Sequence, residues 1–149
     1  MKKNIKRLLT FALMFCLTVT PIFSASAATS QSNGIVPFLN NTRTVLTLCE
    51  VHNEGELEIS YNVHGISGVT TKIVITTYIE KKILGLFWTR VDNGQPNNQW
   101  VSTYYTSDYK GIKLFDLPST GTYRVNVTYV IYGSGGSADS IPYEAEVEY

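Results

Sequence analysis

The sequence has too few cysteines for its fold to depend on disulfide bonds. Of the two cysteines in 149 residues, Cys16 lies in an apolar N-terminal segment and Cys49 in the rest of the chain. If that segment is removed, no intramolecular disulfide is possible, and the fold must rest on hydrophobic burial. The sequence around Cys49 is not basic enough to lower the pKa of its thiol. We therefore predict an unreactive strand residue rather than a reactive or dimerising thiol.

Clustered positive charge is also missing. The chain carries 12 basic and 12 acidic residues, but Lys2, Lys3, Lys6 and Arg7 all lie in the N-terminal segment. Taking these 4 from 12 leaves 8 basic against 12 acidic residues in the rest of the chain, a net charge of −4. Nucleic-acid binding depends on clustered Lys and Arg that displace counterions. We therefore expect no nucleic-acid partner.

Beyond its N-terminus, the sequence has no apolar run long enough to cross a membrane. Residues 1–7 are basic, residues 8–23 are mostly apolar, and Ala25-Ser26-Ala27 has the small residues of a cleavage site. This pattern predicts a signal peptide over residues 1–27, cleaved before Ala28. We expect a secreted or extracellular protein, or one associated with the cell envelope, with no transmembrane anchor after cleavage.

Helical periodicity is absent from the remaining sequence, where apolar and polar residues alternate with period 2. We predict a flexible N-terminal extension over residues 28–43 and one domain over residues 44–149. The alternating segments recur at spacings of about 8 to 12 residues, which is typical of all-β domains. They cover residues 44–52, 56–64, 71–82, 86–91, 100–106, 111–117, 123–131 and 143–149. An antiparallel fold of seven to eight strands follows.

A turn with Pro118 and Gly121 precedes Tyr123, where a strictly alternating strand begins. A tyrosine that enters a half-buried strand in this way is typical of the penultimate strand of immunoglobulin-like sandwiches. We predict that the Tyr123 ring is buried and that its hydroxyl bonds backbone upstream or water. The fold class expected is therefore an immunoglobulin-like antiparallel β-sandwich.

The first two predicted strands should form a hairpin. If Glu54-Gly55 is a two-residue turn, Asn53 pairs with Glu56, and the register of both strands is fixed. The buried face then contains Leu46, Leu48, Leu57, Ile59, Tyr61 and Val63. The opposite face contains Thr47, Cys49, Glu58, Ser60 and Asn62. Further along the chain, we expect Ile112 and Leu114 to point inward.

Several motifs resemble those of a family of short exported proteins from Gram-positive bacteria, which have immunoglobulin-like or fibronectin-type sandwiches and are mostly uncharacterised. The motifs are Gly55-Glu56-Leu57-Glu58-Ile59 through Gly65, Thr71-Lys72-Ile73 with Glu80-Lys81-Lys82, Trp88-Thr89-Arg90-Val91 and Gly121-Thr122-Tyr123-Arg124-Val125. The resemblance implies the fold and supplies no catalytic residue. The chain differs from immunoglobulin domains proper in having Val125 where they carry the second disulfide cysteine.

Residue combinations that support catalysis or metal binding are sparse. In the predicted hairpin, His52 and His64 lie about 23 Å apart, at about 3.3 Å per residue, which is too far for one metal site. The carboxylates of Glu54, Glu56 and Glu58 lie at a turn and along an outer face, where no apolar pocket raises a carboxyl pKa. We expect no enzyme and no cofactor.

Two loops have other possible readings. Residues 133–136 are rich in glycine but contain no lysine and lead into no helix, which favours a hairpin turn over a phosphate-binding loop. The polar loop at residues 92–99 contains oxygen ligands that suit calcium, but these are also ordinary turn residues. We predict no metal site.

Aromatic side chains are the group that suggests a function. The candidates for an exposed patch are Trp88, Trp100, Tyr104, Tyr105 and Tyr109. The two tryptophans could instead close the ends of the core, and a patch could bind an extracellular protein or a glycan. We interpret the chain as a secreted or cell-surface non-enzymatic interaction module of unknown ligand. The alternative is a carbohydrate-binding β-sandwich module that uses exposed aromatics.

Overall fold

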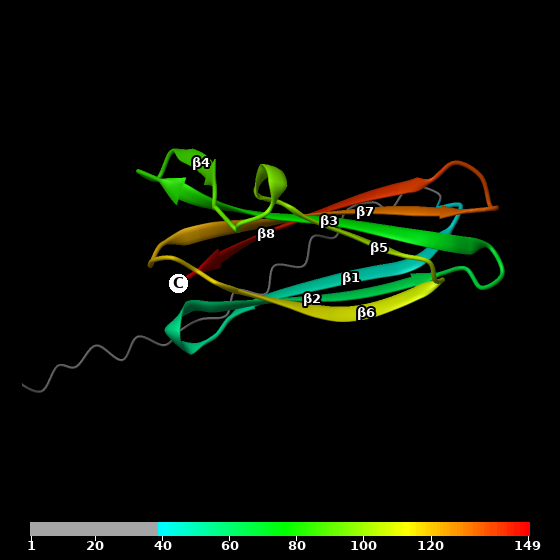
Figure 1. The fold of residues 1–149 in the computed structure, drawn as a ribbon, viewed down its shortest axis with the longest axis horizontal. Helices are drawn as coiled ribbons and strands as arrows, with labels where there is room; N and C mark the ends of the chain where they lie inside the picture. The colour runs from blue at the N-terminus through cyan, green and yellow to red at the C-terminus, as the bar shows by residue number, and fades with distance from the viewer. Residues whose placement is uncertain (1–38) are drawn as a thin grey trace, which may run out of the picture.

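Within residues 39–149, eight antiparallel strands form two sheets that lie face to face in the computed structural model (Figure 1). The structure describes residues 39–149. The predicted signal peptide (1–27) lies outside the described residues, as does most of the predicted extension (28–43). The prediction of an all-β antiparallel fold with seven to eight strands is confirmed. No helix within residues 39–149 is long and apolar enough to cross a membrane.

The strands divide unequally between the sheets. The first sheet contains β1 (Thr42–Val51), β2 (Glu56–Gly65) and β6 (Asp108–Asp116), in that order. The second contains β4 (Phe87–Arg90), β3 (Thr70–Ile83), β7 (Thr122–Gly133) and β8 (Asp139–Glu148), with β5 (Trp100–Tyr104) also paired to β3. Two single helical turns, η1 (Asn53–Gly55) and η2 (Pro96–Asn98), complete the described elements. The long strands β3 and β7 form the centre of the second sheet.

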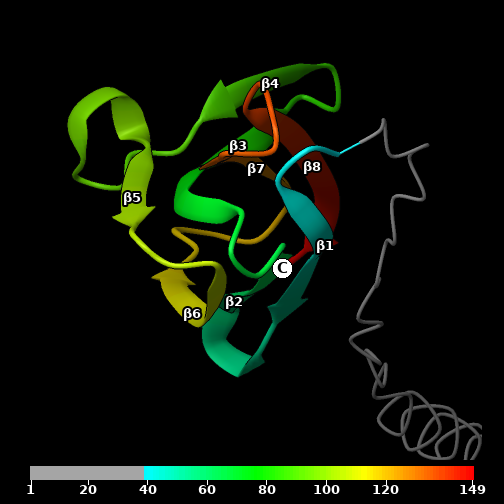
Figure 2. The ribbon, with the colours of Figure 1, turned by 90° about the vertical axis from the view of Figure 1, so that its right-hand side faces the viewer.

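The two sides of the molecule, seen end-on in Figure 2, are built differently. On one side β1 lies beside β8. On the other, the chain leaves β5 in the second sheet and enters β6 in the first sheet after only three residues. The β5–β6 side is therefore lined by strands from both sheets, and it contains the candidate site.

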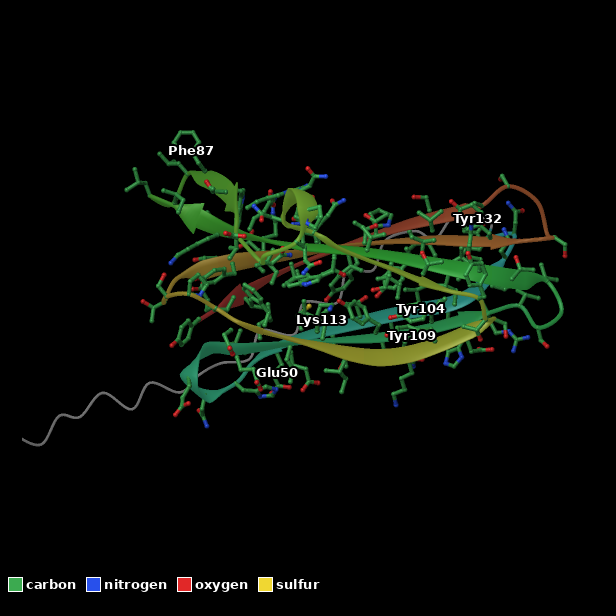
Figure 3. The ribbon with its side chains drawn as sticks, in the orientation of Figure 1. Glu50, Phe87, Tyr104, Tyr109, Lys113 and Tyr132 are labelled. Atoms are coloured by element: carbon green, nitrogen blue, oxygen red, sulfur yellow. The ribbon has the colours of Figure 1, made fainter. Side chains whose placement is uncertain are left out.

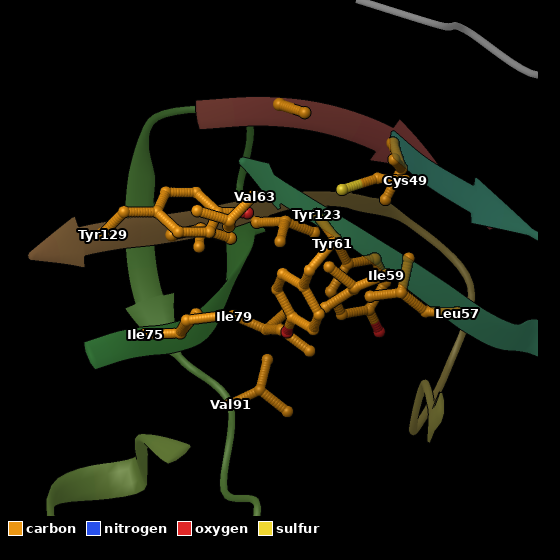
Figure 4. Packing of buried hydrophobic residues seen from close by; sticks show 14 of the residues in the cluster. Cys49, Leu57, Ile59, Tyr61, Val63, Ile75, Ile79, Val91, Tyr123 and Tyr129 are labelled. Carbon is orange, nitrogen blue, oxygen red and sulfur yellow. The ribbon is translucent and has the colours of Figure 1, made fainter. Parts of the chain in front are cut away.

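Tyrosine hydroxyls cross the core between the sheets. Tyr129 on β7 hydrogen-bonds Thr47 on β1, with 2.5 Å between the hydroxyl oxygens. Tyr61 on β2 hydrogen-bonds Thr77 on β3 at 3.0 Å. The Tyr61 and Tyr129 rings meet edge to face, with centroids 6.4 Å apart (Figure 4). The Tyr61 and Tyr129 phenols therefore both have a partner in the opposite sheet, which avoids the cost of an unsatisfied hydroxyl.

Cys49 on β1 also points into the core, where it is 9% exposed. Burial raises the pKa of its thiol to about 12, although a hydrogen bond with Tyr143 on β8 acts in the opposite direction. Because the thiolate is the reactive form, Cys49 is an inert core residue. The predicted unreactive thiol in a strand agrees with this position.

The predicted hairpin register is wrong by one residue. β1 and β2 pair Val45 with Val63 and Cys49 with Ile59, so that Thr47 and Cys49 face the core. Leu46 and Leu48 lie on the outer face, and Leu48 is 43% exposed. The predicted inward positions on β2, Leu57, Ile59, Tyr61 and Val63, are all buried.

The turn explains the shift. His52 N donates to Glu56 O at 2.8 Å, which leaves three residues, Asn53–Gly55, in the connection instead of two. Glu54 and Gly55 both have positive φ, at 69° and 83°. One extra residue in the turn moves every β1 side chain to the opposite face. The two leucines lose their burial, and Thr47 and Cys49 reach the tyrosine hydroxyls.

The inward positions predicted for β6 are also wrong. β6 pairs with β2 so that Lys113 lies opposite Ile59 and Phe115 opposite Leu57, both on the inner face. Ile112 and Leu114 consequently face outward, and Ile112 is 63% exposed. The strand begins at Asp108, before the predicted segment at residues 111–117. This register brings a lysine toward the space between the sheets.

The corner at Tyr123 forms as predicted. Its side chain is fully buried, and its hydroxyl donates to Ser119 O at 2.5 Å. Just before it, Gly121 exchanges two backbone hydrogen bonds with Tyr149, at 2.8 and 3.0 Å. The tyrosine thus joins the turn to the strand, and the turn holds the end of β8.

A buried carboxylate fixes the beginning of β1. Asp139 accepts hydrogen bonds from Asn40 N and Asn41 N, both at 2.8 Å, and from Thr42 Oγ1 at 2.7 Å. Burial raises the pKa of Asp139, but these hydrogen bonds outweigh it and hold the pKa below the ordinary 3.8. β1 therefore begins at Thr42, inside the segment predicted as an extension.

The cross-sheet pair of Thr47 and Tyr129 yields a stability prediction. Thr47→Val preserves shape but leaves the Tyr129 hydroxyl buried without this partner, and should cost about 1 to 3 kcal/mol in the free energy of unfolding. The double variant Thr47→Val/Tyr129→Phe should cost less than the sum of the single changes. Thr44→Val, on the exposed face of β1, is the matched control and should change stability by less than about 0.5 kcal/mol. Urea unfolding of these three variants and of the single variant Tyr129→Phe measures the costs. Strictly additive costs would contradict the coupling.

Asp139 yields a second prediction. Asp139→Asn places an NH₂ group among three donors and should cost about 2 to 4 kcal/mol at neutral pH. The lowered pKa of Asp139 contributes stability above the unfolded value of 3.8, which is lost as pH falls through the lower folded pKa. The variant should therefore lose less stability than the wild type on acidification below pH 3.8. Parallel acid dependence of the two proteins in urea unfolding would contradict this role.

Candidate functional site

A cavity of about 90 Å³ lies between β5 and β6, where the two sheets approach each other. Its lining comes from both sheets and consists of Tyr61, Ile75, Thr77, Trp100, Ser102, Tyr104, Tyr109, Ile112 and Lys113. Alternate β5 residues face it because Trp100, Ser102 and Tyr104 pair with inward positions of β3. We call this cavity the β5–β6 cleft.

Two stacked tyrosines connect the walls of the cleft. The rings of Tyr104 on β5 and Tyr109 on β6 are nearly parallel, with centroids 3.7 Å apart. Tyr104 donates a hydrogen bond to the Tyr109 hydroxyl at 2.7 Å. Burial and this hydrogen bond raise the pKa of Tyr109 to about 12, so the phenol is neutral at physiological pH. The pair links the two sheets and leaves its hydroxyls at the cleft.

Trp100 and Lys113 form the centre of the cleft. The Trp100 ring meets Phe115 edge to face, with centroids 5.4 Å apart, and this contact holds the indole against the core. Lys113 Nζ lies 5.0 Å from the centroid of the Trp100 ring. In Figure 3, Lys113, Tyr104 and Tyr109 lie between the two sheets. Within residues 39–149, no carboxylate forms an ion pair with Lys113.

The remaining polar groups of the cleft are hydroxyls. Tyr61 and Thr77 share their hydrogen bond on the core side. Ser102 on β5 has no hydrogen-bond partner for its hydroxyl in the described part of the chain. The lining thus contains hydroxyl groups and one ammonium, but neither histidine nor carboxylate. Such a set can bind and orient a polar ligand.

The structure brings together three of the five aromatic residues predicted as a patch. Trp100, Tyr104 and Tyr109 line the β5–β6 cleft. Tyr105 follows β5 and is 84% exposed, outside the cleft lining. Trp88 lies on β4, where the charged groups of Arg124 and Lys82 are 4.4 and 5.2 Å from the centroid of its ring. The five rings therefore do not form a single surface.

The surroundings of Trp88 are an ion-pair network on the outer face of the second sheet. Arg124 donates to Glu80 Oε2 through Nε at 2.9 Å and Nη2 at 2.7 Å, and Asn126 donates to the same oxygen at 3.1 Å. Glu144 lies 3.5 Å from another Arg124 nitrogen. Because these charged groups pair with one another, we interpret the network as a structural contact of the sheet and not as a ligand site.

Sequence reasoning missed Lys113. The expectation that Ile112 and Leu114 point inward placed this lysine on the solvent face. The signal that could have located it is the aromatic pair Tyr109 and Phe115, which share its parity along β6. Aromatic side chains bury large areas, and Tyr109 and Phe115 both pack against the core.

The histidines lie away from the cleft and from each other. His52 Nε2 is 3.3 Å from Glu58, beside the first turn, and His64 Nδ1 is 2.9 Å from Asp108, at the other end of β2. Across residues 39–149, no group of three or more His, Cys, Asp and Glu side chains could hold a metal ion. In the loop at residues 92–99, Asp92 and Asn93 accept backbone hydrogen bonds from Gly94 and Gln95 at 3.0 Å, as turn residues do.

Comparison of the chain with protein-family models, with curated proteins and with solved structures gave no match. The function is therefore argued from the geometry of the cleft.

Tyr109 yields an alkaline prediction. Its folded pKa of about 12 exceeds the ordinary 10.0, so its contribution to stability is complete below pH 10 and is lost as pH rises toward 12. Tyr109→Phe should weaken the decline of unfolding free energy between these pH values. Urea unfolding at a series of pH values measures the effect. An unchanged slope in the variant would show that Tyr109 does not titrate differently in the folded state.

Proposed function

We propose that this chain is a non-enzymatic interaction module whose ligand binds in the β5–β6 cleft. The observation that carries the proposal is Lys113, an inward-facing ammonium among aromatic rings with no carboxylate partner in residues 39–149. Lys113 is half-buried, and an ammonium in that position can form a charge-assisted hydrogen bond with an anionic acceptor. A ligand with an anionic group would supply that partner.

The proposal includes the cellular setting. The pattern of residues 1–27 favours a signal peptide, and the protein would then act outside the cytoplasm or at the cell envelope. Two facing antiparallel sheets and the Tyr123 corner favour an immunoglobulin-like sandwich, as does the resemblance to short exported proteins of Gram-positive bacteria. Val125 occupies the inward position at which immunoglobulin domains proper have a cysteine. The sandwich would serve as a rigid support for the cleft.

Carbohydrate binding is the second candidate. Trp100 and the stacked tyrosines offer aromatic faces, and the cleft hydroxyls offer hydrogen bonds. Sugar rings combine an apolar C–H face with many hydroxyls, so they match both features. A stable protein–protein interface buries about 800 Å² on each partner. A cavity of about 90 Å³ is suited to a smaller ligand.

A binding survey tests the proposed function. The protein without residues 1–27 is applied to a glycan array and to washed envelope preparations from Gram-positive bacteria, alongside two lysine variants. Lys113→Met removes the cleft ammonium, whereas Lys110→Met removes an exposed ammonium on the outer face of the same strand. Binding to at least one glycan or envelope preparation should be lost in Lys113→Met and retained in Lys110→Met. Absence of all binding, or equal binding by both variants, would refute the proposal.

A further inference from the structure

We propose that the β5–β6 cleft binds an acidic sugar, whose carboxylate pairs with Lys113. The inference rests on the proposed function and names the ligand class for the same site. It follows from three properties of the cleft: its single cation, its spare hydroxyl protons and its size.

The charge of the cleft selects a monovalent anion. Lys113 is the charged residue of the lining, and within residues 39–149 no carboxylate forms an ion pair with it. One ammonium balances one carboxylate and forms a charge-assisted hydrogen bond with it. A phosphate monoester carries nearly two negative charges at neutral pH and would leave one unbalanced. The net charge of −4 beyond residue 27 also repels a ligand with many negative charges more strongly than a ligand with one.

The hydroxyls supply donors beyond the ammonium. The phenols of Tyr104 and Tyr109 hold two protons and use one in their mutual hydrogen bond. The pair of Tyr61 and Thr77 likewise keeps one proton in reserve. Ser102 has a hydroxyl with no partner among residues 39–149. A sugar ring offers these donors several oxygen acceptors spread over its edge, whereas acetate offers only its two carboxylate oxygens.

The aromatic walls and the volume set the size of the ligand. Trp100 and Tyr104 lie on the same face of β5, with Ser102 between them, and both rings line the cleft. A cavity of about 90 Å³ is several times the minimum of about 10 to 15 Å³ that holds one water. It therefore accommodates a carboxylate with part of one ring, such as the edge of a uronic acid, while the rest of a glycan chain extends into solvent.

The test uses three small probes that separate these contributions. Glucuronate has both the carboxylate and the ring, glucose has the ring alone, and acetate has the carboxylate alone. Each is titrated into the ¹⁵N-labelled protein without residues 1–27, and backbone and indole NMR shifts are followed. We expect glucuronate to bind at least about tenfold more tightly than glucose or acetate, and to shift the signals of Trp100, Ser102, Tyr104, Tyr109 and Lys113. Added salt should weaken binding of glucuronate.

Three lysine variants provide the controls. Lys113→Met should weaken glucuronate binding at least about tenfold, whereas Lys113→Arg should retain most of it because it keeps the charge. Lys110→Met should bind as the wild type does. Urea unfolding of each variant identifies any loss of fold. If Lys113→Met unfolds, the wild-type comparison of glucuronate with glucose and acetate still decides the test.

Several results would overturn the inference. Equal binding of acetate and glucuronate would show that the sugar ring is not recognised, and equal binding of glucose would show that the carboxylate is not. Glucuronate shifts outside the cleft, or unchanged binding by Lys113→Met, would also refute it. If glucuronate fails while the binding survey shows capture that depends on Lys113, the proposed function stands and the acidic-sugar assignment is wrong.

Discussion

The structure depends on polar contacts that tyrosine hydroxyls make across its core, from one sheet to the other. Tyr129 meets Thr47, Tyr61 meets Thr77, and Tyr143 meets Cys49. Hydrophobic burial alone holds two sheets together without fixing how they align, since it has no direction. A buried phenol must find its acceptor or donor, and that requirement fixes which strand positions face inward and how the sheets align.

This requirement also explains how far the sequence could predict the fold. Alternation located the strands, and the strongest patterns placed Ile59, Tyr61 and Tyr123 correctly in the core. It failed at β1 and β6, where apolar residues occupy both faces of a strand. At β1 the choice between Leu48 and Cys49 is decided by a three-residue turn and by tyrosines far along the chain, neither of which local hydrophobicity reveals.

The candidate site could be predicted only in part, because the same ambiguity in strand orientation affects β6. Its aromatic members were predicted from composition, and three of them, Trp100, Tyr104 and Tyr109, do meet at the β5–β6 cleft. Alternation within β6 favoured Ile112 and Leu114 as its inward residues, and the pairing of β6 with β2 is what fixes Lys113 on the inner face instead. That pairing joins residues 44 to 60 positions apart in the sequence, from His64 with Asp108 to Glu56 with Asp116. Trp88 was grouped with the others because it is close in sequence, yet β4 carries it to an outer face. Trp88 and Trp100 belong to the same sheet but lie on opposite faces of it, so proximity in sequence is a poor guide to proximity in space here.

The Asp139 carboxylate has a consequence for the order of folding. It joins residues 40 to 42 to the beginning of the last strand, across separations of 97 to 99 residues. Contacts of such long range close large loops and form late, after local hairpins. The first strand to be synthesised thus acquires its final anchor only when the last strand is present. If the chain is exported, as we propose, this delay would keep it incompletely folded, and so able to pass through a membrane channel, until nearly all of it has been synthesised.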